Sequence, residues 1–525
     1  MTTGLPHSEP TAQAVWRRTV AWILGAALLR GLLSALVPLL PDETYYWDWS
    51  RRLEAGYFDH PPGIALLLAL GTKVLGPTAA GVRLGPALAA LITHVAAAAA
   101  AWLLGGRELP GARAALRAAQ LIALMPIATA GLVLATPDAA LFATATVAVL
   151  AVERALAQPP RSLRSLAWWT MAGFALGGAF VAKYTAVLLP FGLVVACLVH
   201  PALRRRFLDL GPWWASLIAL GLFAPVVVWN AFNDWVSFRF QLGHGFNAAA
   251  RGNPLSRELE MLGGQAGLAS PILFGLLALV LWQALRDGWR ERHTLAPTDV
   301  ATRRFALAVV SLTPLGFFAV SAWRRPVEAN WPAMIYPAGI LLLATSRDAR
   351  VLGVWWKRGL VFAGVLVSVV ALQVATPVLP VPPRRDPIAR AFGWDSLAAA
   401  VDRARHDPWL DGTVDRWVAA NTYQDASELA FHLPDHPRVF SLNLATRTNQ
   451  YDVWPNAWGR VRPGDALVLA IEATPKGDSL AAVVGQWFDE TKPGGNVSLR
   501  RKDGEVTTRR LWLYRIARTF PREKP

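Results

Sequence analysis

The chain has 525 residues, of which 54% are apolar and 17% are charged, and its formal net charge at pH 7 is +16. Charged residues are scarce as far as about residue 380, which excludes a string of soluble domains over most of the length. No nucleic-acid-binding motif accompanies the basic charge. We therefore expect no nucleic-acid partner and assign the charge to membrane topology and lipid headgroups.

Largely uncharged runs recur along the first three-quarters of the chain. A membrane-spanning helix needs roughly 17 or more such residues, and eleven runs come close to this requirement. The tenth run is short and contains proline. The predicted spans lie near residues 18–40, 82–105, 115–135, 137–157, 166–182, 184–200, 212–230, 262–285, 305–322, 331–345 and 359–377.

Basic residues mark every second connection between the predicted spans, beginning with Arg17 and Arg18 before the first. Because basic loops stay in the cytoplasm, we expect a cytoplasmic N-terminus, and the odd number of spans places the C-terminal tail outside. The first apolar run is too long for an ordinary signal-peptide core, so we predict an uncleaved anchor. Cys197 is the only cysteine, which allows no disulfide within the chain.

The composition changes after the proline-rich linker at residues 376–387. Helical patterns at 395–405, 426–433 and 479–488 alternate with strand-like runs at 439–444, 466–471 and 510–516. We therefore predict a polytopic α-helical membrane protein with a small C-terminal α/β domain. The predicted boundaries are 1–379 for the transmembrane part, whose outer loop 41–81 carries an acidic motif, and 380–525 for the extracytoplasmic domain.

An acidic pair, Asp42–Glu43, directly follows the first span and opens a cluster of aromatic, basic and His-Pro-Pro residues that ends at Pro62. A plain membrane anchor does not need such a cluster, and a carboxylate here could serve as a general base. A helix N-terminus explains the pair equally well, because Pro41 precedes it and acidic residues are favoured in a first turn.

Two apolar stretches are each interrupted by a charged residue, Asp138 in one and Lys183 in the other. The basic loops at both ends of each stretch are expected in the cytoplasm, so each interruption should lie at the outer turn of a helical hairpin. Ionised groups at bilayer depth cost about 2.5–3.5 kcal/mol each. Several such groups gathered at one membrane face therefore suggest a cavity that they line. The same argument places further polar residues at this face, namely Arg239, His244, Arg324, Arg325, Glu328 and Asn330.

These residues resemble the GT-C superfamily of polyprenyl-phosphate-sugar-dependent glycosyltransferases. The resemblance is closest to the bacterial branch related to dolichyl-phosphate-mannose protein mannosyltransferases and to aminoarabinose transferases of lipid A. It covers roughly residues 16–345 and is specific for the superfamily rather than for a substrate. The motifs that carry it are Asp42-Glu43-Thr44-Tyr45-Tyr46, Gly56-Tyr57-Phe58-Asp59-His60-Pro61-Pro62, Thr136-Pro137-Asp138, Ala182-Lys183-Tyr184-Thr185 and Glu328-Ala329-Asn330-Trp331.

The resemblance implies an enzyme of a bacterial inner membrane that moves a sugar from a polyprenyl phosphate to an envelope acceptor, which is a lipid, a glycan or a protein. It also implies that Asp42 is the catalytic base. The chain departs from the aminoarabinose transferases at two positions. Asp59-His60-Pro61 replaces an acidic-Lys-Pro motif, and Tyr45 stands where an arginine is expected, so the donor sugar cannot be carried over.

Sugar transfer from a lipid phosphate needs a base, a cationic site for the leaving phosphate and exclusion of water. Asp42 is the candidate base, with Glu43 as its neighbour, and a single displacement would invert the anomeric centre. The phosphate is assigned first to Lys183 and then to Arg239 and Arg325. The remaining predicted substrate-binding residues are Tyr45, Tyr46, Asp59, His60, Asp138, Tyr184, Glu328 and Asn330.

Several alternatives stay open at this point. The tyrosines could belong to an interfacial aromatic belt, and Asp138 could orient Lys183, help to select an acceptor or cap a turn. A divalent metal at Asp59, His60 and His244 is a further hypothesis, and no other cofactor is indicated. In the outer domain, residues 423–428 and 447–455 are rich in sugar-recognising groups, and we expect the second segment to face the membrane cavity.

Two rival functions also fit parts of this pattern. A transporter or flippase of lipid-linked sugars would use the same charged outer cavity, although such proteins usually have paired halves, which this sequence lacks. A non-catalytic scaffold leaves the polar cluster unexplained.

Overall fold

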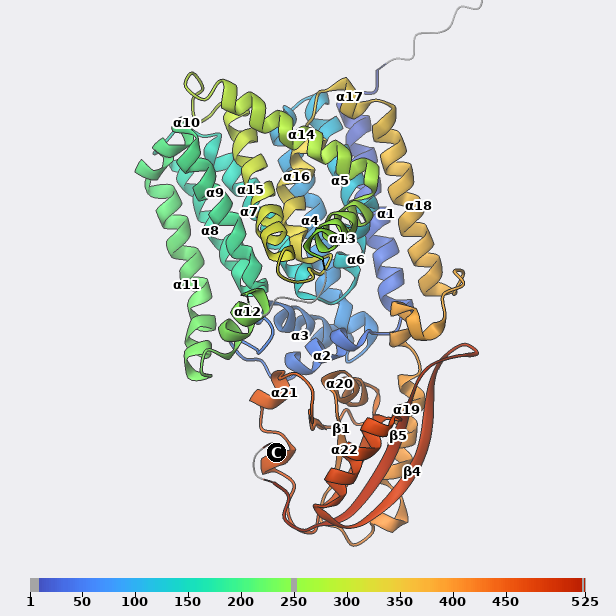
Figure 1. The fold of residues 1–525 in the computed structure, drawn as a ribbon. Coiled ribbons are helices and arrows are strands. Elements are labelled where there is room, and N and C mark those ends of the chain that lie inside the picture. The colour runs from blue at the N-terminus through green and yellow to red at the C-terminus, as the bar shows by residue number, and fades with distance from the viewer. Residues whose placement is uncertain (1–8, 247–252, 522–523, 525) are drawn as a thin grey trace, which may run out of the picture. The chain divides into compact units, whose positions relative to one another are not determined.

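The computed structural model describes residues 9–246, 253–521 and 524. Two compact units divide the chain (Figure 1). The first comprises the described parts of Met1–Ser34, His60–Leu67 and Arg83–Ala371, and the second comprises those of Ala35–Asp59, Leu68–Val82 and Leu372–Pro525. The second unit therefore joins the segment that carries Asp42 to the C-terminal part of the chain.

The first unit is helical. Among the described residues, eight helices are long and apolar enough to cross a membrane, and the number reaches ten if each of two bent pairs is one span. The eight helices are α1 (Ala12–Leu36), α4 (Ala79–Gly105), α7 (Pro137–Leu156), α8 (Leu163–Ala182), α11 (Leu210–Phe232), α14 (Pro271–Arg290), α15 (Val300–Ala322) and α18 (Val354–Ala375).

Breaks in the apolar runs explain why this number falls below the predicted eleven. A bend of 65° separates α5 (Leu109–Leu124) from α6 (Pro126–Val133), where Pro126 cannot continue the helix before it. The predicted span 184–200 falls in the second bent pair, where 111° separates Tyr184–Val199 from Pro201–Leu208. The predicted span 262–285 is kept but starts later, because Ser270 with φ 75° separates α13 (Pro254–Ala269) from α14. The predicted span 331–345 forms only the short η3 (Trp331–Met334) and α16 (Ile335–Ala344).

Shorter elements complete this part of the chain. The turn after α8 forms η1 (Tyr184–Val187), which leads into α9 (Leu188–Val199). The other short elements are α3 (Gly63–Leu75), α10 (Pro201–Arg204), η2 (Arg205–Leu208), α12 (Val236–Phe246) and α17 (Ala349–Leu352).

Small residues bring the helices of the first unit close together. A Cβ at Gly173 of α8 would lie 2.8 Å from the carbonyl oxygen of Ala215 in α11, so only glycine permits this approach. Membrane helices use small residues in this way because lipid supplies no hydrophobic force between them. The core that results includes a continuous buried cluster from α4, α5, α7, α14, α15 and α16.

The second unit contains a five-stranded mixed sheet with the order β2-β1-β3-β5-β4. Strand β1 (Arg416–Ala420) is parallel to β2 (Val439–Ser441) and to β3 (Ala466–Glu472). Strand β5 (Gly504–Ala517) is antiparallel to β3 and to β4 (Phe488–Arg501). The sheet confirms the predicted α/β class, although β1 and β4 were not expected from the sequence.

Helices of the second unit pack beside this sheet: α19 (Trp394–Arg405), α20 (Tyr423–His432), α21 (Gln450–Val453) and α22 (Pro475–Gly485). Helix α2 (Pro41–Ser50) packs against α20, and the hydroxyl oxygens of Thr44 and Ser427 lie 3.1 Å apart. This packing places the acidic pair beside side chains from the C-terminal part of the chain.

Candidate functional site

Asp42 and Glu43 occupy the first turn of α2, directly after Pro41. The Glu43 carboxylate accepts a hydrogen bond from the backbone N–H of Leu40 at 3.0 Å, and its side chain is buried. Asp42 is exposed to solvent. The two adjacent carboxylates thus lie in different environments, with Glu43 capping the helix and Asp42 accessible to a substrate.

A hydrogen-bonded chain of side chains connects Asp42 to Asp59. One guanidinium nitrogen of Arg447 donates to Asp59 Oδ1 at 2.8 Å, and the other donates to the Tyr423 hydroxyl at 3.3 Å. That hydroxyl lies 3.5 Å from Asp42 Oδ1, which is the longest and weakest link. Arg447 thereby holds Asp59 firmly while Asp42 remains only loosely bound.

The surroundings of Asp42 make it a stronger base than an ordinary aspartate. The loss of hydration beneath surrounding protein atoms raises the pKa of its carboxyl, and the negative charge of Asp59 raises it further. Arg447 and the Tyr423 hydroxyl oppose the increase without cancelling it. A base with a raised pKa holds an abstracted proton more strongly, which suits general-base chemistry.

Tyr45 supports this arrangement from the interior. Its hydroxyl donates to Asp59 Oδ2 at 2.9 Å and accepts from the backbone N–H of Gln450 at 2.8 Å. Its ring lies 4.4 Å from the ring of Tyr423, centroid to centroid. Tyr46 is buried next to it. Hydrogen bonds and ring contacts within the second unit therefore hold Tyr45 in place.

A second cluster lies in the first unit, where α8 ends at Ala182. The ammonium of Lys183 donates to Asp138 Oδ1 at 2.8 Å, and the side-chain amide of Asn330 donates to Asp138 Oδ2 at 2.8 Å. Lys183 and Asp138 are buried, whereas Asn330 is exposed. Three residues far apart in the sequence thus meet. The hydrogen bond between Asp138 and Lys183 fits the first of the three predicted roles of Asp138, which is to orient Lys183.

Close packing fixes the backbone beside Lys183. A Cβ at Gly63 would lie 2.8 Å from the Cα of Ala182 and 2.8 Å from the carbonyl oxygen of Val181. Lys183 itself has an extended backbone, which ends the helix and turns the side chain toward Asp138. The position of the ammonium therefore depends on a glycine that follows the His-Pro-Pro motif.

The other predicted residues of the first unit are spread over several elements. The Tyr184 hydroxyl lies 3.5 Å from the side-chain nitrogen of Asn230, and Arg325 lies over the ring of Trp331 at 5.1 Å. Arg239 on α12 and Glu328 are exposed, and His60 is half-buried. Neither Arg239 nor Arg325 forms an ion pair with another residue in the described part of the chain.

The metal hypothesis is neither supported nor overturned. Among the described residues, no three His, Cys, Asp or Glu side chains gather as a metal site would require. The side chain of His244 lies outside the described residues. Both oxygens of Asp59 already accept hydrogen bonds, from Tyr45 and from Arg447. A metal ion bound by Asp59 would have to share these oxygens with the two donors.

Sequence reasoning placed Glu428 in the sugar-recognising segment 423–428 but missed its pairing with His432, in which only Glu428 is fully buried. Glu428 and His432 lie one turn apart on α20, with 3.2 Å between Oε2 and Nε2. Burial raises the pKa of Glu428 to about 7, although His432 opposes the shift. His432 also lies 2.7 Å from Asp395. The spacing of four residues was the only sequence signal for this pair.

Comparisons with known proteins agree with the motifs. Residues 59–229 match the family model described as dolichyl-phosphate-mannose-protein mannosyltransferase. The lipid A galacturonosyltransferase RgtD of Rhizobium johnstonii is 27% identical over 307 residues. The undecaprenyl phosphate-alpha-4-amino-4-deoxy-L-arabinose arabinosyl transferase of Pseudomonas paraeruginosa is 29% identical over 317 residues. These alignments cover 57% and 56% of this chain but only 59% and 54% of the relatives.

Solved structures agree on the fold. The crystal structure of ArnT from Cupriavidus metallidurans bound to undecaprenyl phosphate matches with a TM-score of 0.63 at 17% identity. The match covers 94% of this chain and 97% of that one. The same protein in the apo state gives a TM-score of 0.62. The resemblance and the predicted fold class are therefore confirmed, and the chain is a multi-pass membrane protein.

Proposed function

We propose that this chain, which has the GT-C fold, transfers a sugar from a polyprenyl-phosphate donor to a lipid acceptor of a bacterial envelope. Two relatives support the assignment, since one is named for lipid A and the other for an undecaprenyl-phosphate sugar. A glycan or a protein remains an alternative acceptor. The observation that carries the proposal is Asp42, an accessible carboxylate with a raised pKa and only one long hydrogen bond.

In the proposed reaction, a hydroxyl oxygen or an amine nitrogen of the acceptor attacks the anomeric carbon of the donor sugar. Asp42 takes the proton from the attacking atom as the new bond forms. The bond between the anomeric carbon and the phosphate oxygen breaks, and the phosphate leaves with the electron pair. This single displacement inverts the anomeric centre.

Lys183 is proposed to hold the leaving phosphate. An ammonium has three N–H donors, and one of them binds Asp138. The other two are available to phosphate oxygens, while Asp138 and Asn330 keep the side chain in place. Arg239 and Arg325 are proposed as further cations for the phosphate. That Asp42 and Lys183 act on one donor molecule is part of the proposal.

The proposed orientation follows from the arginine-rich loops. These loops and the N-terminus lie in the cytoplasm, and the C-terminal part of the chain lies outside. Alkaline phosphatase fused after the last residue is then active in cells, whereas green fluorescent protein at the same place is dark. The reverse pair of results would overturn the orientation.

The central experiment is sugar transfer by purified Asp42→Asn protein. Undecaprenyl-phosphate donors carrying galacturonic acid or 4-amino-4-deoxyarabinose are supplied with lipid A, and the product is detected by mass spectrometry. Loss of a general base lowers kcat by about 10² or more, while the donor Kd changes little. The matched control is Asp411→Asn, which makes the same chemical change at a side chain that is 72% exposed. We expect this variant to retain activity.

Other results would separate the rival functions. An Asp42→Asn protein that turns over the donor at the wild-type rate contradicts the assignment of the base. Movement of lipid-linked sugar across vesicles without acceptor, unchanged by this substitution, favours the transporter. Mass spectrometry of envelope glycolipids from a deletion strain identifies the acceptor, and an unchanged glycolipid profile with altered glycans or proteins overturns the lipid assignment.

A further inference from the structure

Helix α13 is not among the helices that are long and apolar enough to cross a membrane. Its buried side chains are those of Arg257, Met261, Gln265 and Ala269. They recur every four residues, so they lie on one face of the helix. Charged and amide side chains are buried in a membrane protein where they find partners, and both polar residues of this face have partners in one segment of the chain, residues 322–336.

Arg257 binds the end of α15. Its Nε donates to the backbone carbonyl of Ala322 at 2.8 Å, and a second guanidinium nitrogen donates to the carbonyl of Trp323. The last carbonyls of a helix have no partner within the helix, and its dipole favours a cation there. Arg257 therefore fixes the point at which the chain leaves α15 and enters segment 323–331.

Gln265 binds the other end of this segment. Its side-chain nitrogen donates to the carbonyl of Ala329 at 2.7 Å, and its side-chain oxygen accepts from the hydroxyl of Tyr336 at 3.1 Å. The side chains of Gln265 and Tyr336 are fully buried, so water does not compete for either of them. The two chain segments are also in close contact, since a Cβ at Gly264 would lie 3.3 Å from the Cβ of Ala329.

The bond from Gln265 acts on the residue that orients Asp138. Asn330 directly follows Ala329, and its side-chain amide donates to Asp138, which accepts from Lys183 with its other oxygen. Ala329 and Asn330 are both exposed, so packing does little to hold them. Because a peptide unit is planar, fixing the Ala329 carbonyl also fixes the Cα of Asn330.

Met261 lies between the two polar residues on the same face of α13. It belongs to a small buried cluster that includes Leu188, and Trp331 packs against this cluster. Leu188 begins α9 shortly after Lys183, and Trp331 directly follows Asn330. One apolar cluster on α13 thus joins the segments that carry Lys183 and Asn330.

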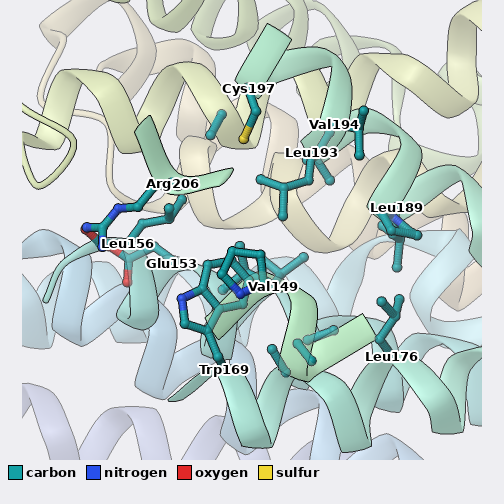
Figure 2. A pocket seen from close by; sticks show the side chains of 18 of the residues that line it. Val149, Glu153, Leu156, Trp169, Leu176, Leu189, Leu193, Val194, Cys197 and Arg206 are labelled. Carbon is teal, nitrogen blue, oxygen red and sulfur yellow. The ribbon is translucent and has the colours of Figure 1, made fainter. Parts of the chain in front are cut away.

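Empty space beside α9 increases the importance of this cluster. Leu189, the next residue of the helix, lines an apolar cavity of about 170 Å³ whose wall includes Cys197 near the other end of α9 (Figure 2). A cavity supplies no atoms for packing. Contacts of Leu188 with the cluster therefore contribute more to fixing the start of α9.

We propose that α13 is a positioning helix for the proposed phosphate site, and that Gln265 is its principal positioning residue. The helix holds both ends of segment 323–331, so that Asn330 and the carboxylate to which it donates keep the Lys183 ammonium in place. Gln265 touches neither donor nor acceptor and acts only through Asn330. This role of α13 rests on the proposed function, because it assumes that Lys183 binds the donor phosphate.

Gln265→Met is the sharpest variant, because methionine has nearly the same length but lacks the amide donor and acceptor. It removes one partner each from the Ala329 carbonyl and the Tyr336 hydroxyl. Tyr336→Phe removes only the hydroxyl, so Gln265 keeps its bond to Ala329. The matched control is Gln283→Met on α14, which removes an amide hydrogen bond to Asp348 elsewhere in the first unit.

The test is binding of undecaprenyl phosphate to the purified full-length protein, measured by isothermal titration. This probe carries the phosphate and the hydrocarbon chain but no sugar, so its binding reports on the phosphate site and not on the base. Loss of one hydrogen bond in Gln265→Met should raise the Kd about threefold to tenfold. Tyr336→Phe should raise it less, and Gln283→Met should bind as the wild type does.

A double-mutant cycle with Asn330→Ala distinguishes positioning from a general loss of stability. If Gln265 acts through Asn330, Gln265→Met has no further effect on the Kd of an Asn330→Ala protein. A merely structural role gives independent effects, and the two increases in Kd then multiply. Wild-type binding by Gln265→Met, or increases that multiply, overturns the proposal.

Lys183→Met separates this proposal from the proposed function. Weaker binding by Lys183→Met and Asn330→Ala, together with wild-type binding by Gln265→Met, overturns the role of α13 and leaves the phosphate site intact. Wild-type binding by all three variants overturns the phosphate assignment, and the role of α13 with it.

Discussion

Replacing Lys183 with methionine removes the charge that pairs with Asp138. The two atoms are 2.8 Å apart, and the side chains are only 9% and 7% exposed. At this separation the attraction is about 6 kcal/mol with an effective dielectric constant of about 20. Desolvation of both ions cancels much of that attraction. Because Asn330 still donates to Asp138, we expect a loss of about 3 kcal/mol, the low end for a broken buried pair.

A double-mutant cycle isolates the interaction. We expect Asp138→Asn alone to cost about as much as Lys183→Met, because it leaves the ammonium buried without its counter-ion. The double variant should be more stable than the sum of the two losses predicts, by about 2 kcal/mol. The free energy of unfolding is measured by titration with sodium dodecyl sulfate and followed by circular dichroism.

Lys357→Met is the matched control, since Lys357 of α18 is exposed and forms no ion pair with another described residue. It should change stability by less than about 0.5 kcal/mol. If the losses of the two single variants add within about 0.5 kcal/mol, the ion pair does not contribute in the folded protein. The reasoning that assigns Asp138 as the partner of Lys183 would then be refuted.

Four further outcomes are expected. Asp59→Asn should move the acid limb of the kcat/KM profile to lower pH, because the Asp59 charge raises the pKa of Asp42 and activity requires the ionised base; an unmoved limb contradicts the network. Burial raises the pKa of Glu428 in the folded protein to about 7, so the wild type loses stability as this carboxyl ionises between its unfolded pKa of about 4.5 and pH 7. Glu428→Gln has no carboxyl to ionise, and it should therefore gain stability relative to the wild type over this range, by at most about 3 kcal/mol. The raised pKa of His432 acts in the same direction, since the stability that its protonated ring contributes to the wild type is also lost as pH rises. The measurement is thermal unfolding of both proteins at several pH values, and a stability difference between them that does not change with pH would exclude this account. Gly63→Ala should weaken donor binding, measured by isothermal titration, because its Cβ would lie 2.8 Å from the backbone at the end of α8; wild-type affinity would show that this packing does not position the site. Addition of a chelator should leave transfer unchanged, because both oxygens of Asp59 are engaged by protein donors; loss of activity restored by a divalent metal would support the metal hypothesis.

The sequence carried enough information for the fold class and for the local setting of the main candidates. Apolar runs gave the membrane helices, because their length is fixed by the thickness of the bilayer. Pro41 and the acids after it gave a helix start, which α2 confirms. Lys183 interrupted an apolar stretch and required a partner, and the structure supplies Asp138. These features depend on neighbours along the chain.

Other features depended on contacts that have no local signal. Ser270 divides a run that hydropathy alone treats as continuous, since φ angles are set by packing as well as by composition. Arg447 holds Asp59 across 388 positions of sequence, and Glu428 becomes a buried carboxyl below the acidic pair only when α20 meets α2. Hydropathy and helix starts are properties of short segments, so the sequence determines them by itself. The raised pKa of Asp42 and the partners of Asp59 follow from distances between remote side chains, which only the tertiary structure decides.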